Sequence, residues 1–167
     1  MNRTRLRALA AEMETAAPWI GVPEDLGDLL GMVYLITAPS GMRYVGKKLF
    51  LSSVTRKPLK GKKLKRHSKK ESDWRTYFGS SAKLVAELTR KGPAGWRREV
   101  LHLCRSRWEM SYLELKEQLQ RDALLRPDYW NSILHIRLNQ PPAGYKPPGF
   151  FPSAEPAPRP RIRQRPA

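Results

Sequence analysis

Cysteine and histidine are scarce in this chain of 167 residues. Cys104 is the single cysteine, so no disulfide can form within the chain. One cysteine beside three histidines also argues against a structural zinc site. Long apolar runs are missing as well: residues 6–11 are broken by Arg7 and followed by Glu12, which argues against a signal-peptide core and a membrane span. These absences favour a cytoplasmic protein with no membrane association.

Acidic residues are few relative to basic ones. The chain has 15 Asp and Glu against 32 Lys and Arg, which gives a net charge of +17. A charge of this size says nothing about the fold, but it favours a polyanionic partner, and nucleic acid is the commonest one in a cytosol. Apolar residues make up 40% of the chain, enough for one modest core. The composition therefore predicts one nucleic-acid-binding domain with appendages.

Both ends of the chain differ from its centre. Residues 1–30 contain a basic-to-acidic stretch, 3–15, that predicts a helix, and then a linker that includes 19–23. From residue 139 onward proline and arginine dominate, which predicts an extended, disordered tail over 139–167. The folded domain is therefore expected within residues 31–138.

A β-hairpin and a basic loop open the expected domain. Two apolar runs, 33–37 and 43–45, flank the sequence "APSG", in which Pro39 and Gly41 suit a tight turn. The segment 56–70 reads "RKPLKGKKLKRHSKK", and nine of its fifteen residues are Lys or Arg. Self-repulsion and the lack of apolar residues predict a mobile loop there.

Two helices and a third strand follow this loop. Ser81 is a candidate cap for the first helix, and "SRWE" has the spacing of a capping box in which Ser106 caps and Glu109 reaches back. The expected bounds are 82–91 and 106–125 for the helices, 98–104 for the strand, and 132–138 for a last short element. The predicted fold is α+β, with a small three-stranded antiparallel sheet flanked by helices.

Several short motifs occur in a fixed order along this domain. The hairpin carries "VYL" at 33–35 and "YVG" at 44–46, the second helix carries Glu114 in "SYLELK", and "DYWN" ends in Asn131. Together they resemble the GIY-YIG endonuclease superfamily, and "SDWRTYFGSS" makes its phage Seg-type, SegE-like branch the nearest. The first motif departs from the family, with valine in place of glycine and leucine in place of isoleucine.

The resemblance implies hydrolysis of phosphodiester bonds with one divalent metal, Mg²⁺ or Mn²⁺. Tyr34 and Tyr44 would flank the attacking water, and the basic surroundings would lower a phenol pKa toward the range that a general base needs. Gly46 would let the backbone approach the phosphate, and Asn131 would orient the site. Taken alone, two tyrosines on a hairpin are typical of cross-strand packing, so the catalytic interpretation depends on the downstream motifs.

The resemblance places the expected metal ligand on the second helix. The family register favours Glu114, and Glu117 is held as the alternative. Glu109 is discounted because the capping box already uses it. Periodicity places the apolar stripe of this helix on Tyr112 and Leu115, with Leu119 and Ala123 continuing it. The stripe does not decide between Glu114 and Glu117.

Basic residues supply the remaining candidates. The cation that stabilises the transition state is left open among Arg75, Lys47 and Lys48. His67 and His102 are not expected to act as general bases. The predicted nucleic-acid contacts are Lys47, Lys48, Lys60, Lys62, Lys63, Lys65 and Arg66.

The expected function is a metal-dependent DNA endonuclease, phage-encoded and of homing type, acting in the host cytoplasm. The alternative is a DNA- or RNA-binding protein that keeps the fold without cleavage, and a third class is a basic structural protein. The sequence leaves the target site, nicking against double-strand cleavage, and the oligomeric state open.

Overall fold

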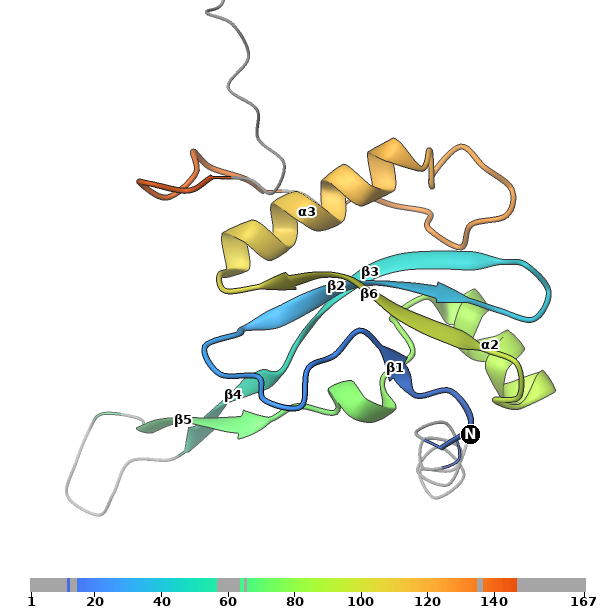
Figure 1. The fold of residues 1–167 in the computed structure, drawn as a ribbon, viewed down its shortest axis with the longest axis horizontal. Coiled ribbons are helices and arrows are strands. Elements are labelled where there is room, and N and C mark those ends of the chain that lie inside the picture. The colour runs from blue at the N-terminus through green and yellow to red at the C-terminus, as the bar shows by residue number, and fades with distance from the viewer. Residues whose placement is uncertain (1–11, 13–14, 57–63, 65, 135–136, 147–167) are drawn as a thin grey trace, which may run out of the picture.

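A four-stranded sheet forms the centre of the domain (Figure 1). The computed structural model describes residues 12, 15–56, 64, 66–134 and 137–146. In the sheet the strand order is β1-β6-β2-β3; β2 is antiparallel to both of its neighbours, and β1 runs parallel to β6. The strands are β1 (Trp19–Ile20), β2 (Gly31–Thr37), β3 (Arg43–Leu49) and β6 (Arg97–Cys104).

The α+β class is confirmed, but the expected sheet was too small. Residues Trp19–Ile20, placed in a linker by the sequence, form β1 and make the sheet mixed instead of purely antiparallel. The predicted hairpin is present, although β3 extends to Leu49 and not to residue 45. A strand of two residues carries no periodic pattern, so only its pairing with β6 defines it.

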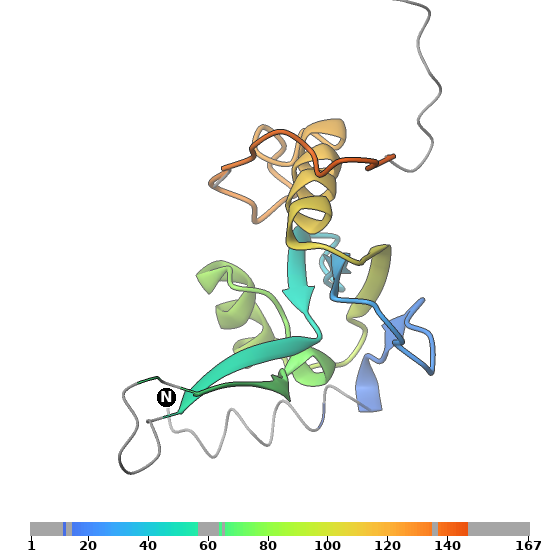
Figure 2. The ribbon, with the colours of Figure 1, turned by 90° about the vertical axis from the view of Figure 1, so that its left-hand side faces the viewer.

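A two-stranded ribbon projects from the sheet (Figures 1 and 2). It consists of β4 (Leu51–Arg56) paired antiparallel with β5 (Arg66–Glu71). The prediction of a loop over 56–70 is therefore wrong for 66–70, because pairing with β4 makes a strand of a segment with no apolar residue. Of the predicted contacts, Arg66 begins β5, whereas Lys60, Lys62, Lys63 and Lys65 lie outside the described residues.

Both predicted helices are present. Helix α2 (Ala82–Lys91) has the expected bounds and Ser81 at its N-cap, although the Ser81 side chain makes no capping hydrogen bond. Helix α3 (Arg107–Gln120) is capped as predicted, because Ser106 Oγ accepts from the Glu109 N–H at 3.0 Å. The Glu109 carboxylate reaches back to the N–H of Arg105, one residue before the cap. The chain leaves the helix at residue 121, earlier than the predicted 125.

The sheet is buried on both faces. Helix α3 covers one face, and α2 and the short helix η1 (Trp74–Thr76) lie at the other (Figures 1 and 2). Strand β2 alternates accordingly: Val33 packs in the cluster beneath α3, whereas Tyr34 packs on the α2 side. Two buried clusters thus hold β2 rigidly between the layers.

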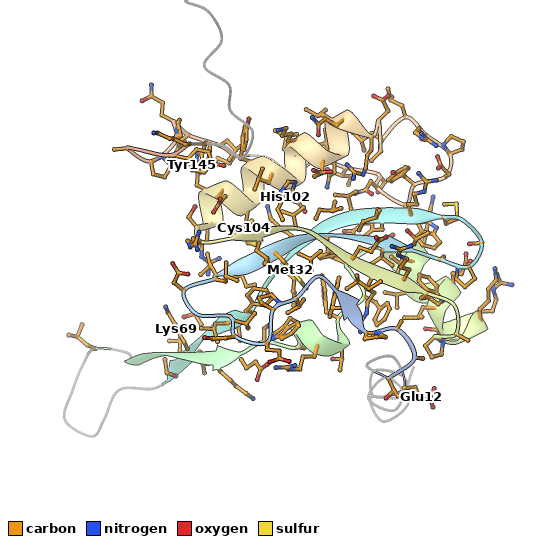
Figure 3. The ribbon with its side chains drawn as sticks, in the orientation of Figure 1. Glu12, Met32, Lys69, His102, Cys104 and Tyr145 are labelled. Carbon is orange, nitrogen blue, oxygen red and sulfur yellow. The ribbon has the colours of Figure 1, made fainter. Side chains whose placement is uncertain are left out.

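The segment after α3 lacks the predicted short element. No helix or strand is present in the described part of 132–138, of which 135–136 lie outside the described residues. The first residues of the expected tail are packed: the Tyr145 ring lies 4.8 Å from that of Trp108, whose Nε1 donates to the Asn139 carbonyl (Figure 3). Residues 147–167, and most of the predicted helix 3–15, lie outside the described residues.

Candidate active site

A cleft of about 580 Å³ opens along the outer edge of β3. It lies between the start of α2, residues 114–118 of α3 and residues 130–133. Four residues singled out from the sequence line it together: Tyr44, Lys47, Glu114 and Asn131. Because they come from three distant segments, the fold itself brings this set together.

The two motif tyrosines lie at different depths. Tyr44 lines the cleft, and its hydroxyl is 3.0 Å from Ser80 Oγ. Tyr34 is 1% exposed and does not line the cleft, although its ring centroid is 6.3 Å from that of Tyr44. The Tyr34 hydroxyl bonds to Tyr77, and Tyr77 bonds to Ser80, so the four hydroxyls form one connected series.

Burial raises the pKa of the Tyr34 phenol well above its ordinary value, and the negative charge that Tyr77, Tyr44 or Glu114 can carry raises it further. The expectation that basic surroundings would favour a phenolate is therefore wrong for Tyr34. Desolvation outweighs the distant cations because it acts on the hydroxyl itself. Tyr34 remains a neutral hydroxyl at physiological pH.

Glycines make room for these two rings. A Cβ on Gly46 would lie 2.5 Å from Tyr34 Oη and 2.9 Å from Tyr44 Cε1, closer than side chains pack. The sequence suggested that Gly46 admits a phosphate, whereas here its open side is filled by the tyrosines. Gly79, which the sequence analysis missed, has a φ of +83° and a position where a Cβ would lie 2.8 Å from Tyr44 Cε1. Both glycines therefore set the ring positions.

Glu114 faces the cleft and is paired with Lys47. Lys47 Nζ lies 2.9 Å from Glu114 Oε2 and donates to Ser111 Oγ at 3.0 Å. Among the residues that the structure describes, no three His, Cys, Asp or Glu side chains gather into a cluster that could hold a metal. Mg²⁺ commonly takes one or two carboxylates and keeps several waters. A single carboxylate, 19% exposed and beside an open cleft, fits such an ion.

Glu117 points elsewhere. Its carboxylate contacts the Nε2 atom of His102, which lies on the strand beneath α3 (Figure 3), at 2.6 Å, and it also pairs with Arg121. The buried residues of α3 are Met110, Leu113, Glu117 and Gln118. Of the predicted apolar stripe, Leu119 is 56% exposed, whereas Tyr112 packs against the cluster beneath α3 and Ala123, beyond the end of the helix, is fully buried. Polar side chains could be buried there because each has a partner.

Asn131 fastens the edge strand. Its Oδ1 accepts from the Val45 N–H at 3.0 Å, and its Nδ2 donates to the Val45 carbonyl at 2.8 Å. Just before it, the Trp130 N–H donates to the Arg43 carbonyl at 2.8 Å, so the chain runs alongside β3. The amide thus continues a strand-like pairing through its side chain.

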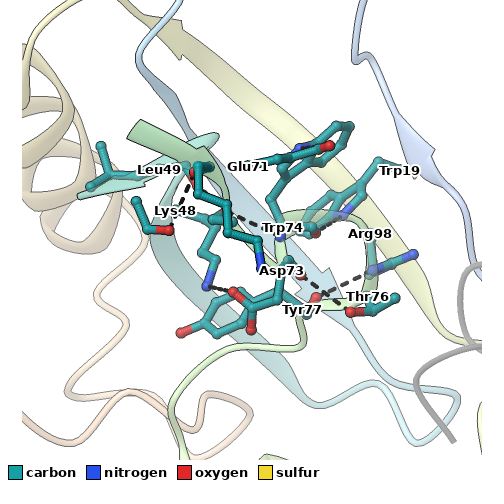
Figure 4. A network of polar contacts seen from close by, with 12 residues as sticks. Trp19, Lys48, Leu49, Glu71, Asp73, Trp74, Thr76, Tyr77 and Arg98 are labelled. Atoms are coloured by element: carbon teal, nitrogen blue, oxygen red, sulfur yellow. Dashed lines mark hydrogen bonds and ion pairs between the residues drawn. The ribbon is translucent and has the colours of Figure 1, made fainter. Parts of the chain in front are cut away.

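The candidate cations are divided among different sites, and Figure 4 shows the surroundings of Lys48. Lys48 contacts Asp73 at 2.5 Å, and its ammonium lies 3.7 Å from the centroid of the Tyr77 ring. Arg75 pairs with Glu71 at 3.0 Å and lines a separate hollow, not the cleft. Of the three cations proposed from the sequence, only Lys47 lines the cleft.

A comparison with known protein families gave a match over most of the described domain. The model of the family described as "Putative endonuclease segE, GIY-YIG domain" matches residues 16–134, more than half of the chain. The chain belongs to this GIY-YIG family. The match includes β1 and the cleft residues. A comparison with curated proteins and one with solved structures gave no match.

The departures from the GIY-YIG motif lie in the core and away from the cleft. Val33, at the position of the family's glycine, is fully buried beneath α3 and does not line the cleft.

None of the helices in the described part of the chain is long and apolar enough to cross a bilayer.

Arg98 is a GIY-YIG-domain residue whose importance the sequence did not reveal. It is fully buried, and its guanidinium donates to the carbonyls of Ala17, Arg75 and Tyr77 at 2.6, 2.8 and 3.2 Å (Figure 4). Arg98 thus fixes the backbone at Arg75 and Tyr77, and Tyr77 in turn contacts the Tyr34 hydroxyl. Lys83 and Ser80, in the cleft lining, were missed as well.

Proposed function

We propose that this protein is a metal-dependent DNA endonuclease that hydrolyses phosphodiester bonds in the β3 cleft. The observation that carries the proposal is the convergence of Tyr44, Lys47 and Glu114 on one open cleft in a chain of the GIY-YIG family. The SegE-like family membership supports a phage-encoded enzyme with a homing role. The net charge of +17 supports DNA as its substrate.

The proposed roles follow from which side chains reach the cleft. Tyr44 acts as the general base in its phenolate form: its oxygen takes a proton from the attacking water while the water oxygen bonds to phosphorus and the bond to the leaving oxygen breaks. Ser80 Oγ, 3.0 Å away, stabilises the phenolate by donating a hydrogen bond to it. Lys47 neutralises Glu114 in this structure, and a phosphate in the cleft competes for the same ammonium. Tyr34, Gly46 and Asn131 act indirectly, because they position Tyr44 and the β3 backbone.

Glu114 is the residue proposed to hold Mg²⁺ or Mn²⁺, with water completing the coordination. A bound divalent ion would supply Lewis-acid stabilisation of the charge that develops on the phosphate. The chain would orient the water through Tyr44 and the phosphate through Lys47, which leaves Arg75 without a proposed catalytic role.

Supercoiled plasmid tests this function directly. We expect nicking by the purified protein with Mg²⁺ and none with EDTA. Glu114→Gln should abolish nicking and leave DNA binding in EDTA nearly intact, whereas Glu117→Gln should keep nicking but lower the melting temperature, because it breaks the His102 and Arg121 contacts. Tyr44→Phe should lower the rate about 10²- to 10⁴-fold, the usual value of a general base.

Two outcomes would contradict the proposal. Binding without any metal-dependent nicking would leave a nucleic-acid-binding protein that keeps the fold. Full activity in Glu114→Gln together with loss of activity in a folded Glu117→Gln variant would show that Glu117, and not Glu114, holds the metal.

A further inference from the structure

A second groove, of about 440 Å³, lies at the base of the β4–β5 ribbon. Four basic side chains line it: Lys47, Lys48, Lys70 and Arg107. Lys47 lines both this groove and the β3 cleft. A ligand that extends out of the cleft past Lys47 therefore enters the groove.

The charges in this groove are unequally neutralised. Lys48 is paired with Asp73, and Lys47 with Glu114. Glu71, which also lines the groove, accepts from Arg75 and Trp74 outside it. Within the described part of the chain, neither Lys70 nor Arg107 forms an ion pair, and both are exposed. These two cations give the groove its net positive potential.

Arg107 also occupies an electrostatically unfavourable position in its own helix. It is the first residue of α3, where the partial positive charge of the helix N-terminus disfavours a cation. Acidic residues are the ones that stabilise a first turn, and α3 already has Glu109 there. Among the described residues, no ion pair compensates the charge of Arg107 at this position. A bound anion would stabilise it.

The lining favours a phosphodiester over a base. Beside the paired carboxylates of Glu71 and Asp73 it offers ammonium and guanidinium groups and the hydroxyl of Ser52, and none of the described residues that line it has an aromatic ring on which a base could stack. Cations and hydroxyls are the usual partners of the phosphate backbone in protein–DNA interfaces. Lys69, the neighbour of Lys70 on β5, is exposed as well but does not line the groove (Figure 3).

We propose that this groove binds the sugar–phosphate backbone of duplex DNA beside the cleavage site, with Lys70 and Arg107 as its phosphate contacts. The inference rests on the proposed function and names where the DNA runs: from the β3 cleft, past Lys47, toward the β4–β5 ribbon. The contacts are independent of base sequence and position the duplex for the cleft.

The salt dependence of DNA binding tests the groove. Binding of a short fluorescein-labelled duplex is measured by anisotropy in EDTA, so that no cleavage occurs. Each phosphate contact contributes about 0.9 to the slope of log K against log salt. The Lys70→Ser/Arg107→Ser variant should therefore lower that slope by about 1.8. The charge-preserving variant Lys70→Arg/Arg107→Lys should retain most of it.

A matched control removes the same charge elsewhere. Arg90 lies near the C-terminus of α2 and Arg97 begins β6, at the opposite end of the molecule from the ribbon (Figure 1). Both are exposed, and Arg97 pairs with Glu99, so the control matches the groove variant in the charge removed but not in its pairing. Arg90→Ser/Arg97→Ser should leave the slope close to wild type. An unchanged slope in the Lys70/Arg107 serine variant, or an equal loss in the control, would overturn the groove assignment. Circular dichroism of each variant confirms that it is folded.

Failure of the groove and failure of the proposed function are distinguishable. If the wild type binds DNA but never nicks plasmid with Mg²⁺, the cleavage proposal fails while the EDTA titration still tests the groove. If Glu114→Gln abolishes nicking but the slope of the Lys70/Arg107 variant is unchanged, the cleavage proposal stands and the groove fails alone.

Discussion

The two motif tyrosines have different environments, which separates their roles. Tyr44 has its hydroxyl at the cleft beside Ser80, whereas the Tyr34 hydroxyl is enclosed by Tyr77 and the Gly46 backbone. A group that transfers a proton to or from a bound water must reach that water. Tyr34 therefore contributes as a packed neutral hydroxyl that fixes its neighbours.

The buried Tyr34 phenol predicts a particular loss of stability at high pH. Its pKa is raised in the folded protein and is about 10 in the unfolded chain. Below about pH 10 both states hold the proton, so stability is unaffected. Above it only the unfolded state releases the proton, and the free energy of unfolding falls by about 1.4 kcal/mol per pH unit until the folded pKa is reached.

Tyr34→Phe should remove this slope. Urea unfolding between about pH 8 and pH 11 measures it, and the difference between wild type and variant isolates Tyr34 from other groups that titrate in this range. The hydrogen bond lost to Tyr77 is subtracted at the lowest pH. Parallel stability curves for the two proteins across the whole range would show that Tyr34 ionises equally easily in both states.

Among the elements, β3 depends most on a segment outside the sheet. It is the last strand in the order β1-β6-β2-β3, so its outer edge has no strand partner. The segment after residue 127 covers that edge with backbone bonds at Arg43 and the Asn131 amide at Val45. Since β3 also carries Tyr44 and Lys47, the covering segment determines the shape of the cleft.

Asn131→Ala should therefore destabilise the domain. It leaves the fully buried Val45 N–H without a partner, at a cost of about 1–3 kcal/mol in the free energy of unfolding. Asn131→Asp should not rescue it, because a carboxylate oxygen would face the Val45 carbonyl. Ser132→Ala, an exposed neighbour that also lines the cleft, is the control and should change stability by less than about 0.5 kcal/mol.

Thermal unfolding followed by circular dichroism gives the comparison. Equal melting temperatures for wild type and Asn131→Ala would mean that the amide does not tether β3. A drop in the Ser132→Ala control as large as that in Asn131→Ala would instead point to a general sensitivity of the segment.

Local signals predicted those elements whose boundaries are local. Helix α2 starts after Ser81 and ends before Gly92, and the Ser106 cap starts α3, so both could be read from turn and cap residues. The ribbon strand β5 has no apolar pattern and exists through pairing with β4. Its identity as a strand was not encoded in its own residues.

In the candidate site, too, burial that depends on distant contacts could not be predicted from local sequence. Resemblance to a family gave Tyr44, Glu114 and Asn131, which the fold brings to one cleft. The burial of Glu117 depends on His102, on a different element, so helical periodicity alone could not reveal it. The burial of Tyr34 likewise depends on residues distant in sequence, and this is why its pKa was expected to move in the opposite direction.

At the scale of the whole molecule, the excess of positive charge opposes folding. The net charge is +17, and the positive side chains repel one another most strongly in the compact state, where they are closest together. Several ion pairs are on the surface, such as Arg105 with Asp28 and Arg75 with Glu71. Exposed pairs of this kind contribute about 0–1 kcal/mol each. Repulsion among 32 basic residues with only 15 acidic ones should therefore outweigh them.

Added salt should accordingly stabilise the protein while it weakens DNA binding. The Debye length falls from about 10 Å at 0.1 M to about 3 Å at 1 M, which screens long-range repulsion more than short contacts. We expect the melting temperature to rise by several degrees between low and high NaCl, since about 1 kcal/mol corresponds to about 2–4 °C in a protein of this size. A constant or falling melting temperature would mean that surface ion pairs dominate.

The two double variants separate this global effect from the local one. Lys70→Ser/Arg107→Ser and Arg90→Ser/Arg97→Ser each remove two positive charges, so both should show a shallower rise of melting temperature with salt than the wild type. Only the first pair lies in the groove beside Lys47, so only that variant should also lose salt dependence of DNA binding. Self-repulsion sums over the entire surface, whereas a phosphate contact requires a particular position. If the two variants differed as much in thermal stability as in DNA binding, their charges would be acting through local contacts in both measurements.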